Sequence, residues 1–270
     1  VETAREEGRQ SMIITFDQHP REVLHADYQP RLLTPLQEKL YLLERTGVDV
    51  VAVLHFDVAL SQLSARDFMH DLLLGRLHVA KLFIGFGHNR AEGFTDYVAY
   101  GREMGMEVVQ NPVFELEGVN VSSTVCRRHV AAGEMEAASR CLGYPYRMGG
   151  RVVAGFQEGR KLGFPTANIQ LADPRRLVPA SGVYAVRVEV GDEATWRLGM
   201  MNIGTRPTFG GEKVSLEVHI FDFAGDLYGC QVEVAFLRRV REERKFASPE
   251  ELAAQLARDK QTILDACCLS

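Results

Sequence analysis

The 270-residue sequence contains no apolar run near the length that crosses a bilayer and no excess of positive charge. A transmembrane helix needs about 20 consecutive apolar residues, and the charged residues 1–7 differ from a signal peptide. We therefore expect a cytoplasmic protein without a membrane partner. The formal net charge is −5, so the overall attraction to a phosphate backbone that is typical of nucleic-acid-binding proteins is absent. We expect no nucleic-acid partner.

Disulfide and metal-binding patterns are also absent. The five cysteines are an odd number without a C-x-x-C pair, and the eight histidines lack the spacing of metal ligands. We interpret the cysteines as reduced structural thiols. The Gly-Lys-Ser/Thr ending of a Walker A phosphate loop does not occur either. The sequence contains 46% hydrophobic and 25% charged residues, which is a globular composition. Its length of 270 residues favours two domains.

The N-terminal half alternates short apolar runs with amphipathic segments. Expected strands are residues 11–16, 48–54, 80–85 and 107–110, and expected helices are residues 34–47, 64–74 and 95–105. Strands that alternate with helices favour right-handed βαβ crossovers and a parallel sheet. The pattern predicts an open, doubly wound, Rossmann-like domain whose ligand binds beyond the carboxyl ends of the strands.

The pattern changes at residues 141–146, where Gly and Pro cluster and the helical periodicity stops. We place the domain boundary there, between residues 143 and 144. Five β-rich runs separated by glycine-containing turns follow, at residues 151–154, 182–190, 196–203, 214–223 and 230–237. Strands without intervening helices predict an antiparallel barrel or sandwich. A Ser-Pro-Glu-Glu start at residue 248 predicts a C-terminal helix.

The densest chemical signal lies in residues 159–169. Gly159 and Gly163 allow a ligand to approach the backbone, Lys161 supplies positive charge, and Thr166 and Asn168 carry oxygen atoms two residues apart. Such oxygens can share Mg²⁺ with the phosphates of a nucleotide. A glycine-rich hairpin with a proline turn explains the spacing equally well.

A second signal lies in the strand expected at residues 214–223. The alternation places Leu216, Val218 and Ile220 on one face of the strand and Glu217 and His219 on the other. If the second face lines a pocket, the Glu217 carboxylate is a suitable general base for a hydroxyl group. From the pattern alone, a solvated carboxylate is the more common explanation.

A third signal is a group of hydroxyls in the N-terminal half. Ser122, Ser123 and Thr124 stand at a strand-to-helix junction, and Arg127 follows one turn later. Free amides at a helix N-terminus, hydroxyls and a guanidinium can together hold a triphosphate. A simple Ser/Thr N-cap is the more common explanation.

Several motifs occur in the order known from one bacterial enzyme family. They are T-F-D-Q-H-P at 15–20, L-T at 33–34 with Lys39, V-S-S-T at 121–124 with Arg127, L-G-Y-P-Y at 142–146, G-F-P-T-A-N-I at 163–169, N-I-G-T-R-P-T-F at 202–209, E-V-H at 217–219 and K-F at 245–246. The chain resembles the bacterial bifunctional riboflavin kinase/FMN adenylyltransferases, also called FAD synthetases, over nearly its whole length.

The resemblance implies both an architecture and a pair of reactions. Residues 1–143 would form an FMN adenylyltransferase domain, and residues 144–270 would form a six-stranded riboflavin kinase barrel with a C-terminal helix. The barrel would transfer the γ-phosphoryl group of ATP to riboflavin, giving FMN and ADP. The first domain would join AMP from a second ATP to FMN, giving FAD and pyrophosphate.

The resemblance also implies roles for the candidate residues. Thr166 and Asn168 would bind Mg²⁺ and the phosphates of ATP, together with Gly159, Lys161 and Gly163. Glu217 would accept the proton of the ribityl hydroxyl. In the other reaction, ATP would be held by Ser122, Ser123, Thr124 and Arg127.

The sequence departs from the family pattern at two places. The family's adenylyltransferase domain opens with a strand and a Gly-Phe-Asp-Gly-x-His-x-Gly-His loop, which does not occur in residues 1–270. Its third strand runs into Gly-x-Asp-x-x-Phe-Gly, whereas Gly85 is followed at once by Phe86 and Gly87 here. We expect residues to be missing from the sequence at both places. The alternative is an active riboflavin kinase with a truncated or inactive adenylyltransferase domain.

Overall fold

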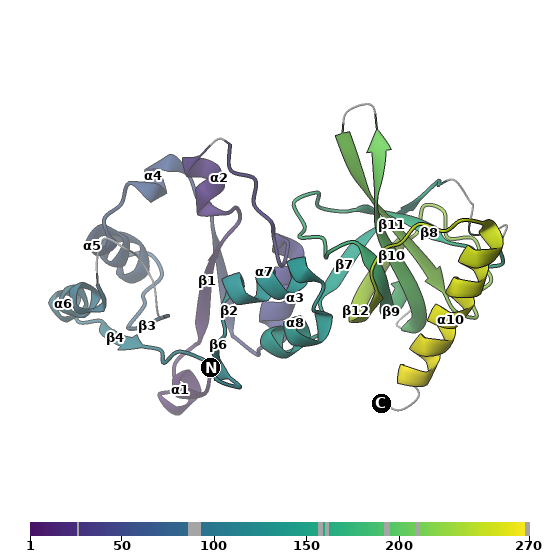
Figure 1. The fold of residues 1–270 in the computed structure, drawn as a ribbon. Helices are drawn as coiled ribbons and strands as arrows, with labels where there is room; N and C mark the ends of the chain where they lie inside the picture. The colour runs from purple at the N-terminus through teal and green to yellow at the C-terminus, as the bar shows by residue number, and fades with distance from the viewer. Residues whose placement is uncertain are drawn as a thin grey trace. The chain divides into compact units, whose positions relative to one another are not determined.

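The computed structural model describes residues 1–25, 27–85, 93–155, 159, 162–191, 195–208 and 211–267. The chain divides into two compact units (Figure 1). The first, which we call the sheet unit, comprises Val1–Pro30 and Thr34–Val121. The second, which we call the barrel unit, comprises Arg31–Leu33 and Ser122–Ser270.

The sheet unit contains the helices and strands that the sequence predicts for this half. Its elements are α1 (Glu2–Glu6), β1 (Met12–Phe16), α2 (Pro20–Leu24), α3 (Leu36–Glu44), β2 (Val50–Leu54), α4 (Val58–Ser61), α5 (Ala65–Asp67), η1 (Phe68–Leu74), β3 (Lys81–Ile84), α6 (Phe94–Met104), β4 (Glu107–Gln110), β5 (Glu115–Leu116) and β6 (Val119–Asn120). The helix expected at residues 64–74 begins with an N-cap at Ser64 and continues as the π-helix η1. Helix α6 ends as expected at Gly105, whose φ of +69° favours glycine.

Strands β1 to β4 pair in parallel, as predicted, but not in one sheet, and the short strands β5 and β6 pair antiparallel. Strand β1 pairs with β2, and β3 pairs with β4, so the described residues form two separate two-stranded parallel sheets. A cavity of about 1790 Å³ is lined by residues of β1 and β3 but not by residues of β2 or β4. The cavity therefore adjoins the edges of β1 and β3 that face away from their partners. Among the described residues, no strand covers either edge.

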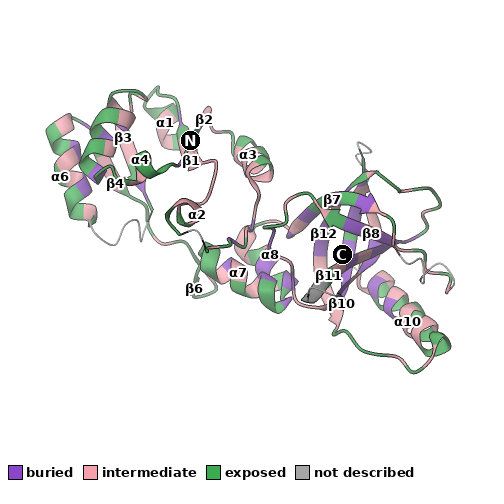
Figure 2. Ribbon diagram, turned by 90° about the horizontal axis from the view of Figure 1, so that it is seen from above, coloured by how far each residue is buried: buried purple, intermediate pink, exposed green. Residues whose placement is uncertain are grey.

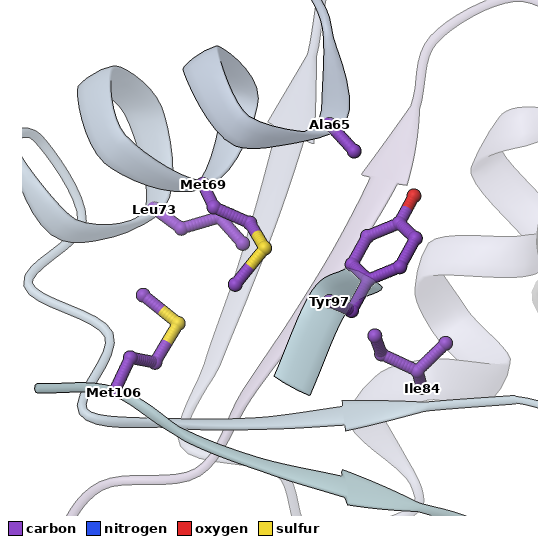
Figure 3. Close-up of a cluster of buried hydrophobic side chains, with 6 residues drawn as sticks. All are labelled: Ala65, Met69, Leu73, Ile84, Tyr97 and Met106. Carbon is purple, nitrogen blue, oxygen red and sulfur yellow. The ribbon is translucent and has the colours of Figure 1, made fainter. Parts of the chain in front are cut away.

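The buried core of the sheet unit lies around one of the two sheets. Met69 and Leu73 of η1 and Tyr97 of α6 pack together with Ala65, Ile84 and Met106 (Figure 3). By contrast, no residue of β1, β2 or α3 is fully buried. The short apolar runs therefore predict the strands correctly, while the burial of β1 and β2 is incomplete.

The barrel unit begins with a helical hairpin and continues with a closed barrel and a helix. Its elements are α7 (Ser123–Ala132), α8 (Met135–Leu142), β7 (Arg147–Val153), β8 (Ala167–Leu171), β9 (Gly182–Val190), β10 (Arg197–Thr208), β11 (Gly211–Ile220), β12 (Gln231–Arg241) and α10 (Pro249–Cys267). The barrel has the strand order β10-β11-β8-β7-β12-β9 and every pairing is antiparallel. The six-stranded barrel and the C-terminal helix are confirmed. Strand β8 begins two residues after Pro165, and the sequence did not predict it as a strand.

Large side chains fill the barrel and also join its outer face to α10. Tyr184 and Phe236 are fully buried and meet edge to face, with ring centroids 5.3 Å apart. On the outside, Ile263 of α10 packs against Val183, Met200 and other apolar residues of the strands. The strands of the barrel consequently contain most of the buried positions in Figure 2.

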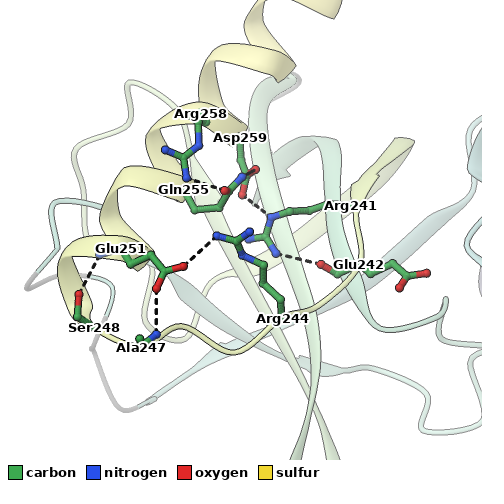
Figure 4. Close-up of polar contacts among 9 residues, drawn as sticks. All are labelled: Arg241, Glu242, Arg244, Ala247, Ser248, Glu251, Gln255, Arg258 and Asp259. Carbon is green, nitrogen blue, oxygen red and sulfur yellow. Dashed lines mark hydrogen bonds and ion pairs between the residues drawn. The ribbon is translucent and has the colours of Figure 1, made fainter.

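A polar cluster fixes α10 beside the end of β12 (Figure 4). Asp259 of α10 is only 2% exposed and accepts hydrogen bonds from Arg241 Nε, at 2.8 Å, and from Gln255 Nε2, at 2.7 Å. Because the buried carboxylate is paired with a guanidinium, its desolvation is offset. Glu251 accepts further hydrogen bonds from Arg244 and from the backbone N–H of Ala247. These hydrogen bonds and ion pairs hold α10 against the outer face of the barrel.

The α7–α8 hairpin packs against the barrel. Gly133 joins the two helices with a φ of +78°, and a Cβ atom there would lie 2.6 Å from the Tyr184 hydroxyl. Helix α8 also contacts β12. The compact units therefore divide between Val121 and Ser122, whereas we place the domain boundary between residues 143 and 144 from the composition. The compact units are defined by packing, whereas the boundary between residues 143 and 144 is drawn from the sequence composition. That boundary stays a prediction.

Candidate active site

The pairing of β8 with β11 brings the principal candidate residues together. Asn168 lies opposite Glu217, and Ala167 lies opposite Val218. Residues directly opposite each other in an antiparallel pair project to the same face. Thr166 Oγ1 donates a hydrogen bond of 3.4 Å to Glu217 Oε2. The fold thus joins the oxygen-bearing segment predicted at residues 159–169 to the carboxylate predicted on the later strand.

The two faces of β11 differ as the sequence predicts. Leu216, Val218 and Ile220 are buried, with exposures of 5%, 1% and 4%. Glu217 lies on the opposite face and is half-buried. From the pattern alone, a solvated carboxylate was the more common explanation for Glu217. The structure instead shows a half-buried carboxylate that lies beside a hydroxyl and an amide.

Glycines allow the segment before β8 to lie close to these side chains. A Cβ atom at Gly159 would overlap the carbonyl of Phe164, and the carbonyl of Gly159 accepts hydrogen bonds from Leu162 and Phe164 at 3.1 and 2.9 Å. Gly163 has a φ of +80° and forms the turn. Lys161, the predicted cation of this segment, lies outside the described residues.

Gly155 is a further glycine of this region that the sequence did not single out. A Cβ atom at this position would overlap the side-chain amide of Asn168. Only a residue without a side chain therefore allows this backbone to touch Asn168. Its place before a segment with two more glycines was the available signal.

The row of polar side chains extends to a third strand. Asn202 of β10 lies opposite Glu217 of β11. Asn168, Glu217 and Asn202 therefore project from neighbouring positions of β8, β11 and β10 toward one face of the barrel. Asn202 opens the N-I-G-T-R-P-T-F motif, but without strand register nothing in the sequence relates it to Glu217.

His219 lies on the same face of β11, two residues beyond Glu217. Its Nδ1 atom is 2.8 Å from the carbonyl oxygen of Pro165, and its ring is only 8% exposed. Burial lowers the pKa of His219, and the hydrogen bond with Pro165 opposes that shift. The sequence shows no metal-ligand spacing around this residue, and it did not predict the contact with Pro165.

The second group of candidates lies at the start of α7. Ser122 is the N-cap, and its hydroxyl accepts a hydrogen bond of 3.3 Å from the backbone N–H of Val125. Ser123 and Thr124 are exposed in the first turn. Arg127 Nε donates to the carbonyl of Arg31 at 3.0 Å, which orients its guanidinium. The N-cap is confirmed for Ser122, and a triphosphate site here stays a prediction.

Polar residues also gather at the carboxyl ends of β1 and β2, where a Rossmann-like domain binds its ligand. Asp17 Oδ2 is 2.6 Å from His55 Nδ1, and Asp17 Oδ1 accepts from the N–H of Phe56. The hydrogen bond with His55 lowers the pKa of Asp17, and the same contact raises the pKa of His55. Lys39 Nζ donates to the carbonyl of Phe16 at 2.9 Å. Two of the quoted motifs therefore meet at this edge.

Comparison with known proteins identifies the family. A family model described as riboflavin kinase matches residues 142–267, and one described as FAD synthetase matches residues 1–125. The bifunctional riboflavin kinase/FMN adenylyltransferase of Escherichia coli (strain K12) is 40% identical over 267 residues, covering 96% of this chain and 84% of that protein. The chain belongs to the bifunctional riboflavin kinase/FMN adenylyltransferase family.

A second member of this family and one solved structure are also similar to this chain. The bifunctional riboflavin kinase/FMN adenylyltransferase of Pseudomonas fluorescens is 40% identical over 263 residues, covering 96% of this chain and 83% of that protein. A crystal structure described as a macrolide-efflux protein from Streptococcus pneumoniae has a TM-score of 0.89 and 32% identity, covering 97% of this chain and 86% of that one. Within the described part of this chain, no helix has the length and apolarity to span a membrane.

The residues present fit the binding of a hard cation by this bifunctional family member. Among the described residues, no cluster of three or more His, Cys, Asp or Glu could hold a metal ion. Mg²⁺ does not need such a cluster, because it is commonly held by one or two protein oxygens together with substrate phosphates. Thr166 and Asn168 offer a hydroxyl and an amide oxygen beside the Glu217 carboxylate. This donor set suits Mg²⁺ better than a softer metal.

Proposed function

We propose that the barrel unit phosphorylates riboflavin at the meeting point of β8 and β11. The observation that carries the proposal is the convergence of Thr166, Asn168 and Glu217, with Thr166 Oγ1 3.4 Å from Glu217 Oε2. ATP donates its γ-phosphoryl group to the 5′-hydroxyl of riboflavin, and the products are FMN and ADP. The family assignment supports this activity for residues 142–267.

The proposed roles follow from what phosphoryl transfer requires, namely positioning and neutralisation of charge. Thr166 and Asn168 hold Mg²⁺ and the phosphates of ATP through their side-chain oxygens. Bound Mg²⁺ supplies positive charge that offsets the charge on the phosphates. Gly159 and Gly163 allow the phosphates to approach the backbone, with Lys161 as a cation. Glu217 accepts the proton of the 5′-hydroxyl as that oxygen attacks the γ-phosphorus.

The order of the polar row gives the reaction a direction. With the phosphates held at β8 by Asn168, the acceptor hydroxyl lies at Glu217 on β11. In-line transfer requires the carbon chain of the acceptor to lead away from the leaving group. The ribityl chain of riboflavin would therefore extend from Glu217 on β11 toward Asn202 on β10. The amide of Asn202 would then lie beside the remaining hydroxyls of that chain.

The second reaction is the adenylylation of FMN, which releases pyrophosphate. Ser122, Ser123, Thr124 and Arg127 hold the ATP for this reaction. The cavity between β1 and β3 offers room for the strand with which the family's adenylyltransferase domain opens. The competing candidate is a riboflavin kinase without adenylyltransferase activity. It is considered because residues 1–270 do not contain the His-x-Gly-His loop of the family's adenylyltransferase domain.

Two assays separate the candidates. The 270-residue chain and a chain extended upstream by the family's strand and loop are each incubated with FMN and MgATP, and FAD is measured by chromatography. FAD from both chains supports the bifunctional proposal for residues 1–270. FAD from the extended chain alone favours riboflavin kinase as the activity of residues 1–270. The peptide between Gly85 and Phe86, where we expect missing residues, lies outside the described residues.

The kinase proposal is tested by Glu217→Gln, which keeps the shape of the side chain and removes the base. Turnover of riboflavin to FMN should fall by about 10²- to 10⁴-fold while ATP binding persists. Glu189→Gln is the matched control, because Glu189 is also a half-buried carboxylate on a barrel strand. Wild-type turnover in Glu217→Gln would show that Glu217 is only a strand residue, and wild-type protein that makes no FMN would reject the function.

A further inference from the structure

The hydrogen-bond ladder between β8 and β11 is short, and it stops where the site begins. Among the described residues, only two pairs are formed, Glu217 with Asn168 and Val218 with Ala167. Continuing the register would bring Thr166 opposite His219, next to Pro165. Proline has no backbone N–H and cannot donate to a ladder. The segment that carries Thr166 therefore needs another attachment to β11.

The side chain of His219 provides that attachment. Its Nδ1 atom lies 2.8 Å from the carbonyl oxygen of Pro165. A carbonyl oxygen can only accept, so Nδ1 must carry the proton in this contact. The imidazole is held edge to face against Phe164, with centroids 5.3 Å apart, and is tilted against Phe221 at 5.6 Å. Aromatic contacts on both sides restrict the movement of the donor.

The attachment lies one peptide bond from a proposed Mg²⁺ and ATP ligand. Pro165 is bonded directly to Thr166, whose hydroxyl is 3.4 Å from Glu217 Oε2. Glu217 and His219 are two residues apart on one strand and face the same side. A single strand thus carries both the proposed base and the group that holds the segment opposite it.

We propose that His219 is a positioning residue for phosphoryl transfer: its Nδ1–H holds the Pro165 carbonyl and thereby fixes Thr166 Oγ1 relative to Glu217. This inference rests on the kinase function proposed above, because the position of Thr166 relative to Glu217 affects the rate only if both residues take part in phosphoryl transfer. A shift of about 1 Å in a reacting geometry can cost about 100-fold in rate. The loss of the attachment should therefore affect the nucleotide side of the reaction more than riboflavin binding.

Two substitutions separate the donor from the volume of the ring. His219→Leu removes the donor and fills much of the space, whereas His219→Asn places an amide N–H close to the position of Nδ1 but leaves a gap. We expect kcat/KM for MgATP to fall by about 10- to 100-fold in His219→Leu and to stay within about threefold of wild type in His219→Asn. KM for riboflavin should change by less than about threefold in both, and Tm should be lower in the Asn variant.

These outcomes distinguish positioning from space filling. If activity follows Tm rather than the presence of the donor, or if both substrates lose affinity equally, His219 only fills the core and the inference is wrong. Failure of the kinase function itself would be visible first, as wild-type protein that makes no FMN.

A measurement on the wild-type protein needs no variant. The ¹⁵N chemical shifts of the His219 ring should show a protonated Nδ1. A ring protonated only at Nε2 would contradict the inference, because such a ring cannot donate to Pro165.

Discussion

Every strand of the barrel has two hydrogen-bonded neighbours, whereas each of β1 to β4 in the sheet unit has one among the described residues. The consequence is visible in burial. The first five residues of β9, Gly182 to Val186, are all buried, and no residue of β1 is. The barrel can therefore place site residues within its strands, because closure fixes the register on both sides. The sheet unit instead offers side chains at strand ends, as at Asp17, whereas the helix start at Ser122 belongs to the barrel unit.

The sharpest test concerns the two reactions, which should respond to different residues although Thr166 and Arg127 both lie in the barrel unit. Thr166→Ala should weaken the use of MgATP in riboflavin phosphorylation by at least about tenfold, about 1.4 kcal/mol, and leave FMN adenylylation unchanged. Arg127→Ala should do the reverse, because its guanidinium is assigned to the other ATP. Both rates are measured on each variant of a chain that shows both activities. A loss of both reactions in either variant would mean that the two sites are not independent.

A second large effect is on stability and uses the same substitution in each unit. Met201 of β10 is fully buried, and Met12 of β1 is 36% exposed. Met201→Ala should cost about 2–5 kcal/mol through lost burial and a cavity, and Met12→Ala less than about 1 kcal/mol. The chain has one tryptophan, Trp196, in the barrel unit, so its fluorescence in urea reports that unit alone.

Circular dichroism of the same samples reports the helices and strands of both units. Equal costs for the two methionine substitutions would contradict the difference in packing between the units.

A smaller effect tests whether the α7–α8 hairpin is fixed to the barrel. Gly133 and Gly143 end consecutive helices with φ values of +78° and +80°. Alanine in this left-handed region costs about 1–2 kcal/mol, so Gly143→Ala, which meets no atom within 4 Å, measures the backbone strain alone. Gly133→Ala should cost about 1–3 kcal/mol more, because its Cβ would lie 2.6 Å from the Tyr184 hydroxyl. Equal shifts in the Trp196 unfolding curve would show that the hairpin moves freely from the barrel.

The smallest effect is a pH dependence of the sheet unit. Hydrogen bonds from the Ser11 hydroxyl and N–H, both at 2.7 Å, lower the pKa of Asp49 below its ordinary 3.8. A carboxyl whose pKa is lower in the folded state stabilises the fold above its unfolded pKa, and this contribution is lost as the pH falls through the folded pKa. The protection of the β1 amides, measured as exchange corrected for its intrinsic pH dependence, should therefore fall below about pH 4.

The control for this pH dependence is Asp49→Asn, which should exchange faster at neutral pH and show a weaker acid response. An unchanged response in that variant would assign the effect to another carboxyl, such as Asp17, whose pKa is also lowered.

The sequence by itself determined most of the longer elements, though not β8, and the family. Alternation at residues 214–223 separated Glu217 from Leu216 and Val218 because the side-chain period of a strand is two, and Gly105 ended a helix because left-handed backbone favours glycine. The motifs then identified the chemistry, since G-F-P-T-A-N-I and N-I-G-T-R-P-T-F occur together in one enzyme family. Local patterns carry this information because they depend on neighbours along the chain.

Only the tertiary structure decided which distant residues meet. Register placed Asn168 and Asn202 on either side of Glu217, and no local pattern encodes a pairing between strands that are far apart in sequence. The contact of His219 with Pro165 depends on the same register and on the early end of the ladder at a proline. The sheet unit gives a second example, because its strands form two-stranded sheets. A short apolar run predicts a strand, but it does not predict how many strands pair with it, since the closure of a sheet is a property of the whole fold.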